Sequence, residues 1–300
     1  MPNFKNISAL CSVFKETDTK EFESSLNSII NQSLPPKEII IIIDGIISEN
    51  LYETIIRYCE SCRIKFFRLD QNKGLGNALS FGLLKCKYKI VARFDTDDIS
   101  LKERFKKQLN FINNGWDLVS SAVVECNKEK KNKKKPTYHL KTFSKVNKEI
   151  TEDDLILRNP INHPSVMFNM QKMVLFNKTY NQKMRKHQDF LLWRELKLDK
   201  KVNFKILHIS DITLIMNSKN LIKKRSSLKS FSYELLLFYY TFLIKKRFDI
   251  HIKLAICFLI RILGIYISLF LYKFIRTRFL IHKVINIEPI EEINSILKNM

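Results

Sequence analysis

The chain has 300 residues, of which 45% are hydrophobic, and its formal net charge at pH 7 is +22. This length and hydrophobic content suffice for one large domain, or for a domain with an appendage. The charge predicts an anionic partner without identifying it, and six cysteines in a chain of this size favour reduced thiols in a cytosolic setting over a disulfide framework. Because no basic stretch followed by a long apolar run opens the chain, we expect no signal peptide.

Strand and helix patterns alternate along the first two thirds of the chain. The run 38–43 is rich in β-branched residues, as a parallel strand buried on both faces should be. Such an alternation predicts an α/β fold, with a mainly parallel sheet and helices on both faces. The predicted strands are 7–14, 38–43, 64–69, 88–94 and 117–125, and the predicted helices are 21–32, a stretch ending near 62, 74–86 and 101–113.

Three carboxylates follow the fourth predicted strand, at Asp95, Asp97 and Asp98. Crowded carboxylates repel one another, and a hard divalent cation makes the arrangement favourable because Mg²⁺ and Mn²⁺ take oxygen ligands. The carboxyl ends of strands are also where open α/β sheets bind their ligands. The alternative is a helix N-terminus, since Asp98 precedes a helical pattern that starts at Leu101. The cluster alone does not decide between these two interpretations.

The C-terminal third is both basic and apolar. Residues 219–283 contain many Lys and Arg but only two acids, Glu234 and Asp249, and include the apolar runs 231–244 and 254–272. This combination predicts attachment to an anionic membrane surface, with a helix lying in the interface. A membrane span that carries Arg261, or a buried helical pair, remains an alternative. We therefore divide the chain into a domain at 1–217 and a helical, membrane-associating region at 218–300.

A dinucleotide-binding fold fits the sequence poorly. Gly74 and Gly76 follow a predicted strand and open a helix, but the third glycine position of the fingerprint is occupied by Leu79. In addition, the acid cluster at 95–98 would repel a pyrophosphate unless a metal ion intervened.

Five short sequence blocks within residues 5–215 resemble those of the family 2 glycosyltransferases, both in their order and in the spacing between them. They are Ser-Val-Phe at 12–14, Ser-Ile-Ile-Asn-Gln-Ser at 28–33 with Ile-Asp-Gly at 43–45, Asn-Lys-Gly-Leu-Gly-Asn-Ala-Leu at 72–79, Val-Ala-Arg-Phe-Asp-Thr-Asp-Asp at 91–98, and Asn-His-Pro-Ser-Val-Met at 162–167 before Gln-Asp-Phe-Leu-Leu-Trp at 188–193. The resemblance implies a GT-A fold, a nucleotide-diphospho-sugar domain with a mixed central sheet.

The resemblance also implies a donor site for a UDP-sugar. Asp44 would accept a hydrogen bond from the N3–H of uracil, and Phe14 would stack on the base or belong to the core. Glu16 lies where the family often has a polar residue near the nucleotide. Lys73 and Arg93 would neutralise phosphate or position the acid cluster.

The acid cluster matches the D-x-D element of the family. The resemblance makes Asp97 the direct ligand of Mn²⁺ or Mg²⁺, and it assigns Asp95 to the ribose or to a metal-bound water. Asp98 is either a further ligand or a helix cap.

The catalytic base is expected at Asp189. An inverting displacement needs one carboxylate to take the proton of the acceptor hydroxyl, and the family supplies it from an acid pair that stands here as Gln188-Asp189. Asp189 could instead be a helix N-cap. His163 is a structural or acceptor-side residue, and His187 is a candidate for contact with the acceptor.

These inferences predict an inverting, metal-dependent glycosyltransferase of surface-glycan biosynthesis. It would use a UDP-sugar and a lipid-linked saccharide acceptor at the cytoplasmic face of the plasma membrane, as a peripheral or monotopic protein. The alternatives are a nucleotidyltransferase and a catalytically inactive membrane scaffold of the same fold. A nucleic-acid-binding protein would explain the charge but not the acid cluster, and no nucleic-acid-binding motif is present.

Overall fold

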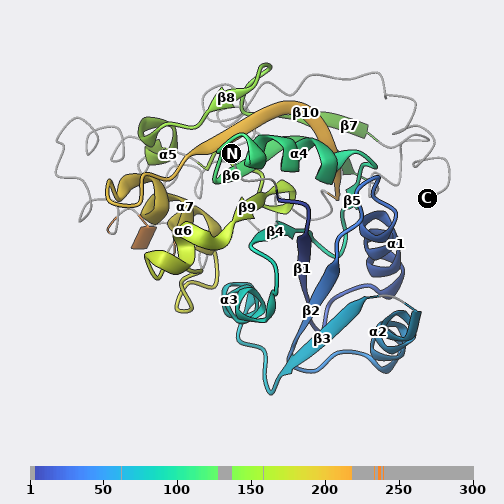
Figure 1. The fold of residues 1–300 in the computed structure, drawn as a ribbon. Helices are drawn as coiled ribbons and strands as arrows, with labels where there is room; N and C mark the ends of the chain where they lie inside the picture. Colours follow the sequence, from blue (N-terminus) through green and yellow to red (C-terminus); the bar gives the residue numbers. More distant parts are fainter. Residues whose placement is uncertain are drawn as a thin grey trace, which may run out of the picture.

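The computed structural model describes residues 4–61, 63–127, 137–157 and 159–217, together with Tyr233, Leu236, Leu237 and Tyr239. One twisted sheet runs through the molecule, and helices lie on both of its faces (Figure 1). The predicted α/β class with a mixed central sheet is therefore confirmed.

The sheet has the strand order β3-β2-β1-β4-β9-β6-β10-β5, with β7 paired to β6 and β8 paired to β10. Strands β3, β2, β1 and β4 run parallel, as do β6 and β10, whereas β9 is antiparallel between β4 and β6. The strands are β1 Ile7–Val13, β2 Glu38–Asp44, β3 Ile64–Leu69, β4 Ile90–Arg93, β5 Ile99–Ser100, β6 Leu118–Asn127, β7 Thr137–Lys141, β8 Lys148–Glu149, β9 Met167–Asn169 and β10 Ile206–Asn217.

The helices divide into two groups, one on each face of the sheet. Buried residues of α1, α2 and α4 pack against one face, and those of α3, α6 and α7 pack against the other. The helices are α1 Thr19–Ile30, α2 Glu49–Ser61, α3 Leu75–Lys85, α4 Arg104–Asn113, α5 Glu152–Leu157, α6 Met170–Leu175 and α7 Gln188–Leu198, with a 3-10 turn, η1, at His163–Ser165.

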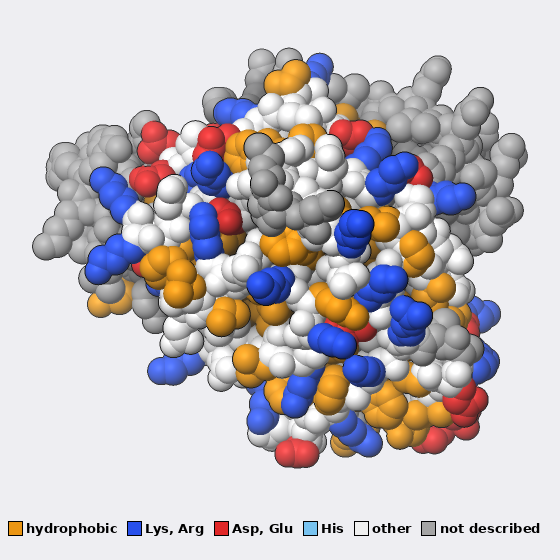
Figure 2. Space-filling view, viewed as in Figure 1, with side chains coloured by type: hydrophobic (Ala, Val, Ile, Leu, Met, Phe, Trp, Pro, Cys, Tyr) orange, Lys and Arg blue, Asp and Glu red, His pale blue; other side chains and the backbone are white. Residues whose placement is uncertain are grey.

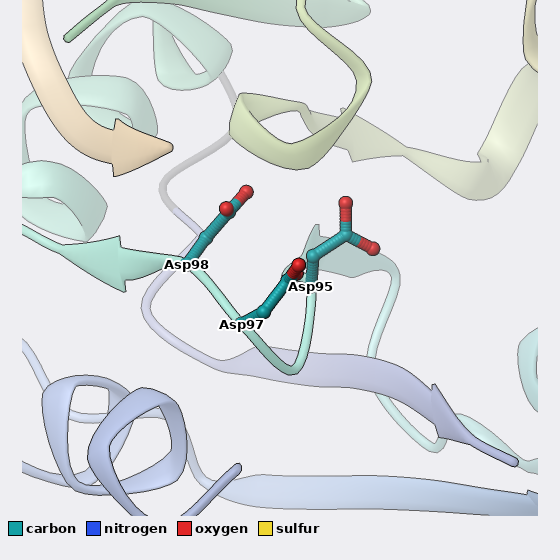
Figure 3. A group of neighbouring side chains, drawn as sticks. All are labelled: Asp95, Asp97 and Asp98. Atoms are coloured by element: carbon teal, nitrogen blue, oxygen red, sulfur yellow. The ribbon is translucent and has the colours of Figure 1, made fainter. Parts of the chain in front are cut away.

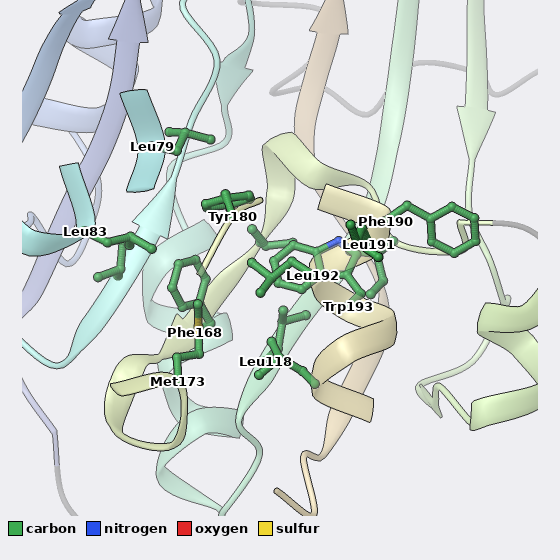
Figure 4. Close-up of a cluster of buried hydrophobic side chains, with 14 of the residues drawn as sticks. Leu79, Leu83, Leu118, Phe168, Met173, Tyr180, Phe190, Leu191, Leu192 and Trp193 are labelled. Carbon is green, nitrogen blue, oxygen red and sulfur yellow. The ribbon is translucent and has the colours of Figure 1, made fainter. Parts of the chain in front are cut away.

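The sequence of strand β2 is almost wholly apolar because both of its faces are buried. Its residues alternate between the two cores, with Ile40 and Ile42 facing α3 and with Ile39, Ile41 and Ile43 facing α1 and α2. Both sides of a parallel strand that is covered by helices must be apolar, because neither side reaches water. Figure 4 shows the core on the α3 and α7 side, where aromatic side chains such as those of Tyr180 and Trp193 gather.

The helix predicted from Leu101 starts later than expected, at Arg104. The two residues before Leu101 form β5, which pairs antiparallel with the end of β10, and the backbone N–H of Leu101 itself donates to the carbonyl of Thr213. The suggestion that Asp98 caps this helix is therefore wrong. The residue at the N-cap position is Glu103, which makes no side-chain capping bond.

Most of the predicted membrane-associating region lies outside the described residues, including the whole run 254–272. Of the run 231–244, Leu237 is buried in the core on the α3 and α7 side, and Tyr233 packs against it. Within the described part of the chain, no helix is both long and apolar enough to span a bilayer. The division at residue 217 stays a prediction.

Arg194 of α7 links this later segment to the domain. Its guanidinium is fully buried and lies 3.9 Å from the centre of the Phe190 ring. Its Nε donates to the carbonyl of Leu155 at 2.8 Å, and its Nη1 donates to the carbonyl of Leu237 at 3.3 Å. A side chain of the 1–217 domain thus donates a hydrogen bond to a carbonyl group that lies beyond the predicted boundary at residue 217.

Candidate active site

The predicted donor-site residues gather at one edge of the sheet. Phe14 follows β1, Asp44 ends β2 and Asp95 follows β4, and these three strands are neighbours and run parallel. Their carboxyl ends therefore meet at the same edge, which is where open α/β sheets bind ligands (Figure 1). The arrangement follows from strand direction alone.

The acid cluster consists of Asp95, Asp97 and Asp98. One carboxylate oxygen from each of these residues lies within 4.8 Å of the others, and the three side chains project from a single loop toward the same side (Figure 3). Asp97 is exposed, Asp95 is partly exposed and Asp98 is buried. A divalent cation could therefore be approached from the side of Asp97 and Asp95.

The buried Asp98 has a perturbed carboxyl. Burial raises its pKa well above the ordinary value, and the negative charges of Asp95 and Asp97 raise it further. Its Oδ1 accepts a hydrogen bond from the backbone N–H of Asn217 at 2.8 Å, while its Oδ2 has no hydrogen-bond partner among the described residues. The unpartnered Oδ2 of Asp98 and the carboxylates of Asp95 and Asp97 together form a set of oxygen donors that suits Mg²⁺ or Mn²⁺.

Arg93 holds the acid cluster in position. Its buried guanidinium forms an ion pair with Asp95. The backbone of Arg93 is held in turn by Arg104, whose Nη2 donates to the Arg93 carbonyl at 2.6 Å. Burial lowers the pKa of Arg104 to about 9, so this side chain is still a cation at neutral pH. Of the two roles predicted for Arg93, the geometry favours positioning of the acid cluster.

Asp44 organises the loop that follows β3. Its two carboxylate oxygens accept from the backbone N–H groups of Lys73 at 2.7 Å and Gly74 at 2.9 Å. The next residue, Gly45, has φ +86, and a Cβ there would lie 2.6 Å from the backbone nitrogen of Asn72. Only glycine allows this approach. Each carboxylate oxygen has a second lone pair, so Asp44 keeps acceptor capacity for a base.

Phe14 and Glu16 both lie in the exposed turn after β1. The side chain of Phe14 is 38% exposed, so the alternative of a core position is wrong. Glu16 is exposed as well. An exposed aromatic ring at the ligand-binding edge of the sheet is available for stacking on a base.

Asp189 lies in the first turn of α7. Its Oδ2 accepts from the side-chain amide of Asn159 at 2.8 Å. The N-cap position belongs to His187, which has a left-handed backbone with φ 57, so the alternative that Asp189 is the N-cap is wrong. The carboxylate is only partly exposed, and Asn159 fixes its orientation.

His163 lies within the core and not on an open surface. It belongs to η1, is buried, and forms a hydrogen bond of 2.9 Å between its Nε2 and the hydroxyl of Tyr180. Burial lowers its pKa well below the ordinary value, and the charge of Arg93 adds to this effect. The geometry favours the structural role for His163 over the acceptor-side role.

Sequence reasoning missed three residues that support the site. Asn159 orients Asp189, Asn217 bonds Asp98, and Arg104 holds the backbone before the cluster. The Asn159-Pro160 pair is a recognisable turn signal, but no local pattern identifies its partner 30 residues further along the chain.

Comparisons with known proteins indicate the same family as the sequence blocks. A model of the family described as Glycosyl transferase family 2 matches residues 8–185. The chain is 34% identical over 169 residues to the amylovoran biosynthesis glycosyltransferase AmsE of Erwinia amylovora, and the match covers 56% of this chain and 61% of the relative. It is 31% identical over 190 residues to the UDP-Gal:alpha-D-GlcNAc-diphosphoundecaprenol beta-1,3-galactosyltransferase of Escherichia coli, covering 62% of this chain and 66% of the relative.

Solved structures show the same fold. S. aureus TarS 1-349 in complex with UDP-GlcNAc superposes with a TM-score of 0.63 at 17% identity, covering 86% of this chain and 73% of that chain. The mannosyltransferase PcManGT from Pyrobaculum calidifontis, in complex with GDP-Man and Mn²⁺, gives a TM-score of 0.53 at 10% identity, covering 77% of this chain and 64% of that chain. The GT-A fold implied by the sequence blocks is confirmed.

The family model spans more than half of the chain, including Asp44 and the acid cluster, and ends just before Asp189. On this match, the chain belongs to glycosyl transferase family 2.

Proposed function

We propose that this protein is an inverting glycosyltransferase that moves a sugar from a UDP-sugar to a lipid-linked saccharide acceptor in cell-surface glycan biosynthesis. The observation that carries the proposal is the meeting of Asp44 and the acid cluster at one edge of a family 2 domain. A site for a nucleoside diphosphate needs a group that bonds the nucleobase and a group that holds the diphosphate. The Asp44 carboxylate supplies the first, and the acid cluster, through a metal ion, supplies the second.

The donor is held by groups of different kinds. Asp44 accepts from the N3–H of uracil, and Phe14 stacks on the base. Asp97 and Asp95 would hold Mn²⁺ or Mg²⁺, which when bound stabilises the charge that develops on the departing diphosphate. The Arg93 ion pair keeps Asp95 in one orientation, so the site is organised before the donor arrives.

Asp189 acts as the general base. The acceptor hydroxyl attacks the anomeric carbon as the bond to the diphosphate breaks, and its proton passes to Asp189. Asn159 aligns the carboxylate for this transfer. His187, which adjoins the first turn of α7, is proposed to contact the acceptor.

Two observations support a lipid-linked acceptor at a membrane. The Escherichia coli relative is named for a diphosphoundecaprenol acceptor, and the C-terminal region combines Lys and Arg with long apolar runs. We propose peripheral or monotopic attachment at the cytoplasmic face of the plasma membrane. The acceptor and the active site would then lie close to the same surface.

Calorimetric titration with UDP, GDP and TDP, with and without Mn²⁺, tests the donor. We expect metal-dependent binding that is selective for UDP, in which Asp44 accepts from the N3–H of uracil. Because thymine and guanine also offer a ring N–H, groups besides Asp44 must contribute to this selectivity. Preference for GDP would retain the transferase but overturn the role of Asp44. If the protein bound no nucleotide, an inactive scaffold would be the better explanation. A nucleotidyltransferase would instead bind a nucleoside triphosphate and release diphosphate.

Sedimentation of the full chain with lipid vesicles tests the membrane attachment. We expect the protein to pellet with vesicles rich in phosphatidylglycerol and to be released by high salt, because each Lys or Arg near an anionic surface contributes ~1 kcal/mol. Vesicles of phosphatidylcholine are the control. If the protein stayed in the supernatant with both kinds of vesicle, the attachment would be refuted.

A further inference from the structure

A basic loop, residues 181–187, joins the core to the first turn of α7. It carries Lys183, Arg185 and Lys186, and no acidic residue occurs between Lys178 and Gln188. Lys183 and Arg185 are exposed, whereas Met184 between them is buried in the core. The buried methionine fixes the middle of the loop, so that the two flanking cations are held at the surface.

This loop is attached to the first turn of α3. The side-chain amide of Asn77 donates to the carbonyls of Lys73 at 3.0 Å and Gln182 at 2.7 Å, and so bridges the two segments. Gly76 allows their close approach, because a Cβ there would lie 3.2 Å from the carbonyl oxygen of Asn181 and 3.3 Å from Gln188. These contacts therefore fix the basic loop against the start of α3.

The contact brings Arg185 next to the backbone that follows Lys73. The Cγ of Arg185 would lie 3.8 Å from a Cβ at Gly74, so the Arg185 side chain passes over the residue that follows Lys73. The position of Lys73 is set by the bond from its N–H to Asp44. Within the described ranges, no ion pair is found for Lys73, Lys183 or Arg185.

The start of α3 adds to the positive potential. Gly74 is the N-cap of this 11-residue helix, so the positive end of the helix dipole lies beside Lys73 and is partly offset by the Asp44 carboxylate, which accepts from the N–H of Gly74. Lys and Arg side chains are spread over the face of the molecule shown in Figure 2, in keeping with the net charge of +22.

We propose that Arg185, with Lys73 and Lys183, forms a diphosphate clamp between the nucleobase carboxylate and the catalytic base. Asp44 accepts from the backbone N–H of Lys73, and Gln188, the residue before Asp189, packs beside Gly76 at the start of α3. Two or three cations presented from two loops match the several charged oxygens of a diphosphate, and the arginine fork can bind two of those oxygens at once.

The proposal rests on the proposed function and adds a binding residue, Arg185, to it. The diphosphate has two possible sources, the UDP-sugar and a diphosphate-linked lipid acceptor. In the donor the diphosphate leaves from the face of the anomeric carbon opposite the attacking hydroxyl, and in a lipid-linked acceptor it lies beyond the sugar whose hydroxyl Asp189 would deprotonate. The chemistry is shared, and binding measurements distinguish the sources.

Binding of UDP, uridine and farnesyl diphosphate to the full chain and to Arg185→Gln, at low salt, tests the clamp. We expect the variant to bind one of the two diphosphates about tenfold more weakly, the loss of one charge-assisted contact, and to bind uridine unchanged. Weaker UDP binding assigns the clamp to the donor, and weaker farnesyl diphosphate binding assigns it to the acceptor. Arg185→Lys, which keeps the charge, should recover most of the affinity.

Arg63→Gln is the matched control. Arg63 is exposed and immediately precedes β3, whereas the loop that Asp44 binds follows the other end of that strand. The loss of Arg63 should therefore leave all three affinities unchanged. If Arg185→Gln bound both diphosphates as the wild type does, the clamp would be refuted. If the wild type bound farnesyl diphosphate but not UDP, and Arg185→Gln weakened that binding, the clamp would stand while the UDP-sugar function would fail.

Discussion

An Asp97→Ala variant is expected to lose Mn²⁺-dependent binding of UDP. Asp97 is the exposed member of the acid cluster, and its carboxylate oxygen lies within 4.8 Å of those of Asp95 and Asp98. Removing it takes away an oxygen ligand and a negative charge, both of which a hard cation requires. Binding measured without metal should change little, because Asp44 and Phe14 remain. Calorimetry of UDP binding across a range of Mn²⁺ concentrations measures the effect.

Asp153→Ala is the control for this prediction. Asp153 is an exposed aspartate in α5, so its removal changes the net charge equally without touching the cluster. Asp97→Ala should also retain the melting temperature of the wild type, since an exposed side chain contributes little to stability. Unchanged Mn²⁺-dependent affinity for UDP in Asp97→Ala would remove the metal site from this position.

An Asp189→Asn variant is expected to bind UDP normally and to lose at least ~10²-fold in turnover, the low end for a general base. The asparagine side chain keeps an oxygen that can accept from Asn159, which now lies 2.8 Å from Oδ2 of Asp189. The fold should therefore be preserved. What is lost is the ability to take a proton from the acceptor hydroxyl. Single-turnover kinetics at saturating donor separates this loss from any change in binding.

Asp199→Asn provides a control at the other end of α7. Asp199 follows the C-terminal end of α7 and pairs with Lys178 at 3.5 Å, so its substitution perturbs the helix without reaching the site. Turnover of Asp199→Asn should match that of the wild type. If Asp189→Asn retained near-normal turnover, another group would have to be the base.

The main elements of the domain could be predicted because they rest on local patterns. The β-branched run of β2 and the spacing of apolar residues in α1 and α4 are set by burial of one or both faces. The position of the site followed from the direction of parallel strands. Asp44 ends β2 and Asp95 follows β4, the parallel strands on either side of β1, so their carboxylates had to lie at the same edge.

The remaining features depend on contacts between distant residues. Strands β5, β8 and β9 have only two or three residues each, which is too few for a periodic pattern, and they form because longer strands pair with them. The bond between Asn217 and Asp98 joins residues 119 positions apart. No local signal indicates that Asp98 is held by a strand end and does not cap a helix.

The buried guanidinium of Arg194 has a practical consequence for shortening this protein. A chain ended at residue 217 would remove the Leu237 carbonyl that Arg194 binds and would leave a buried cation with fewer acceptors, a costly change in a protein interior. It would also expose the apolar surface that Leu237 covers beside α7. A fragment for crystallisation should therefore extend past Tyr239, so that the helix carrying Asp189 keeps its natural packing.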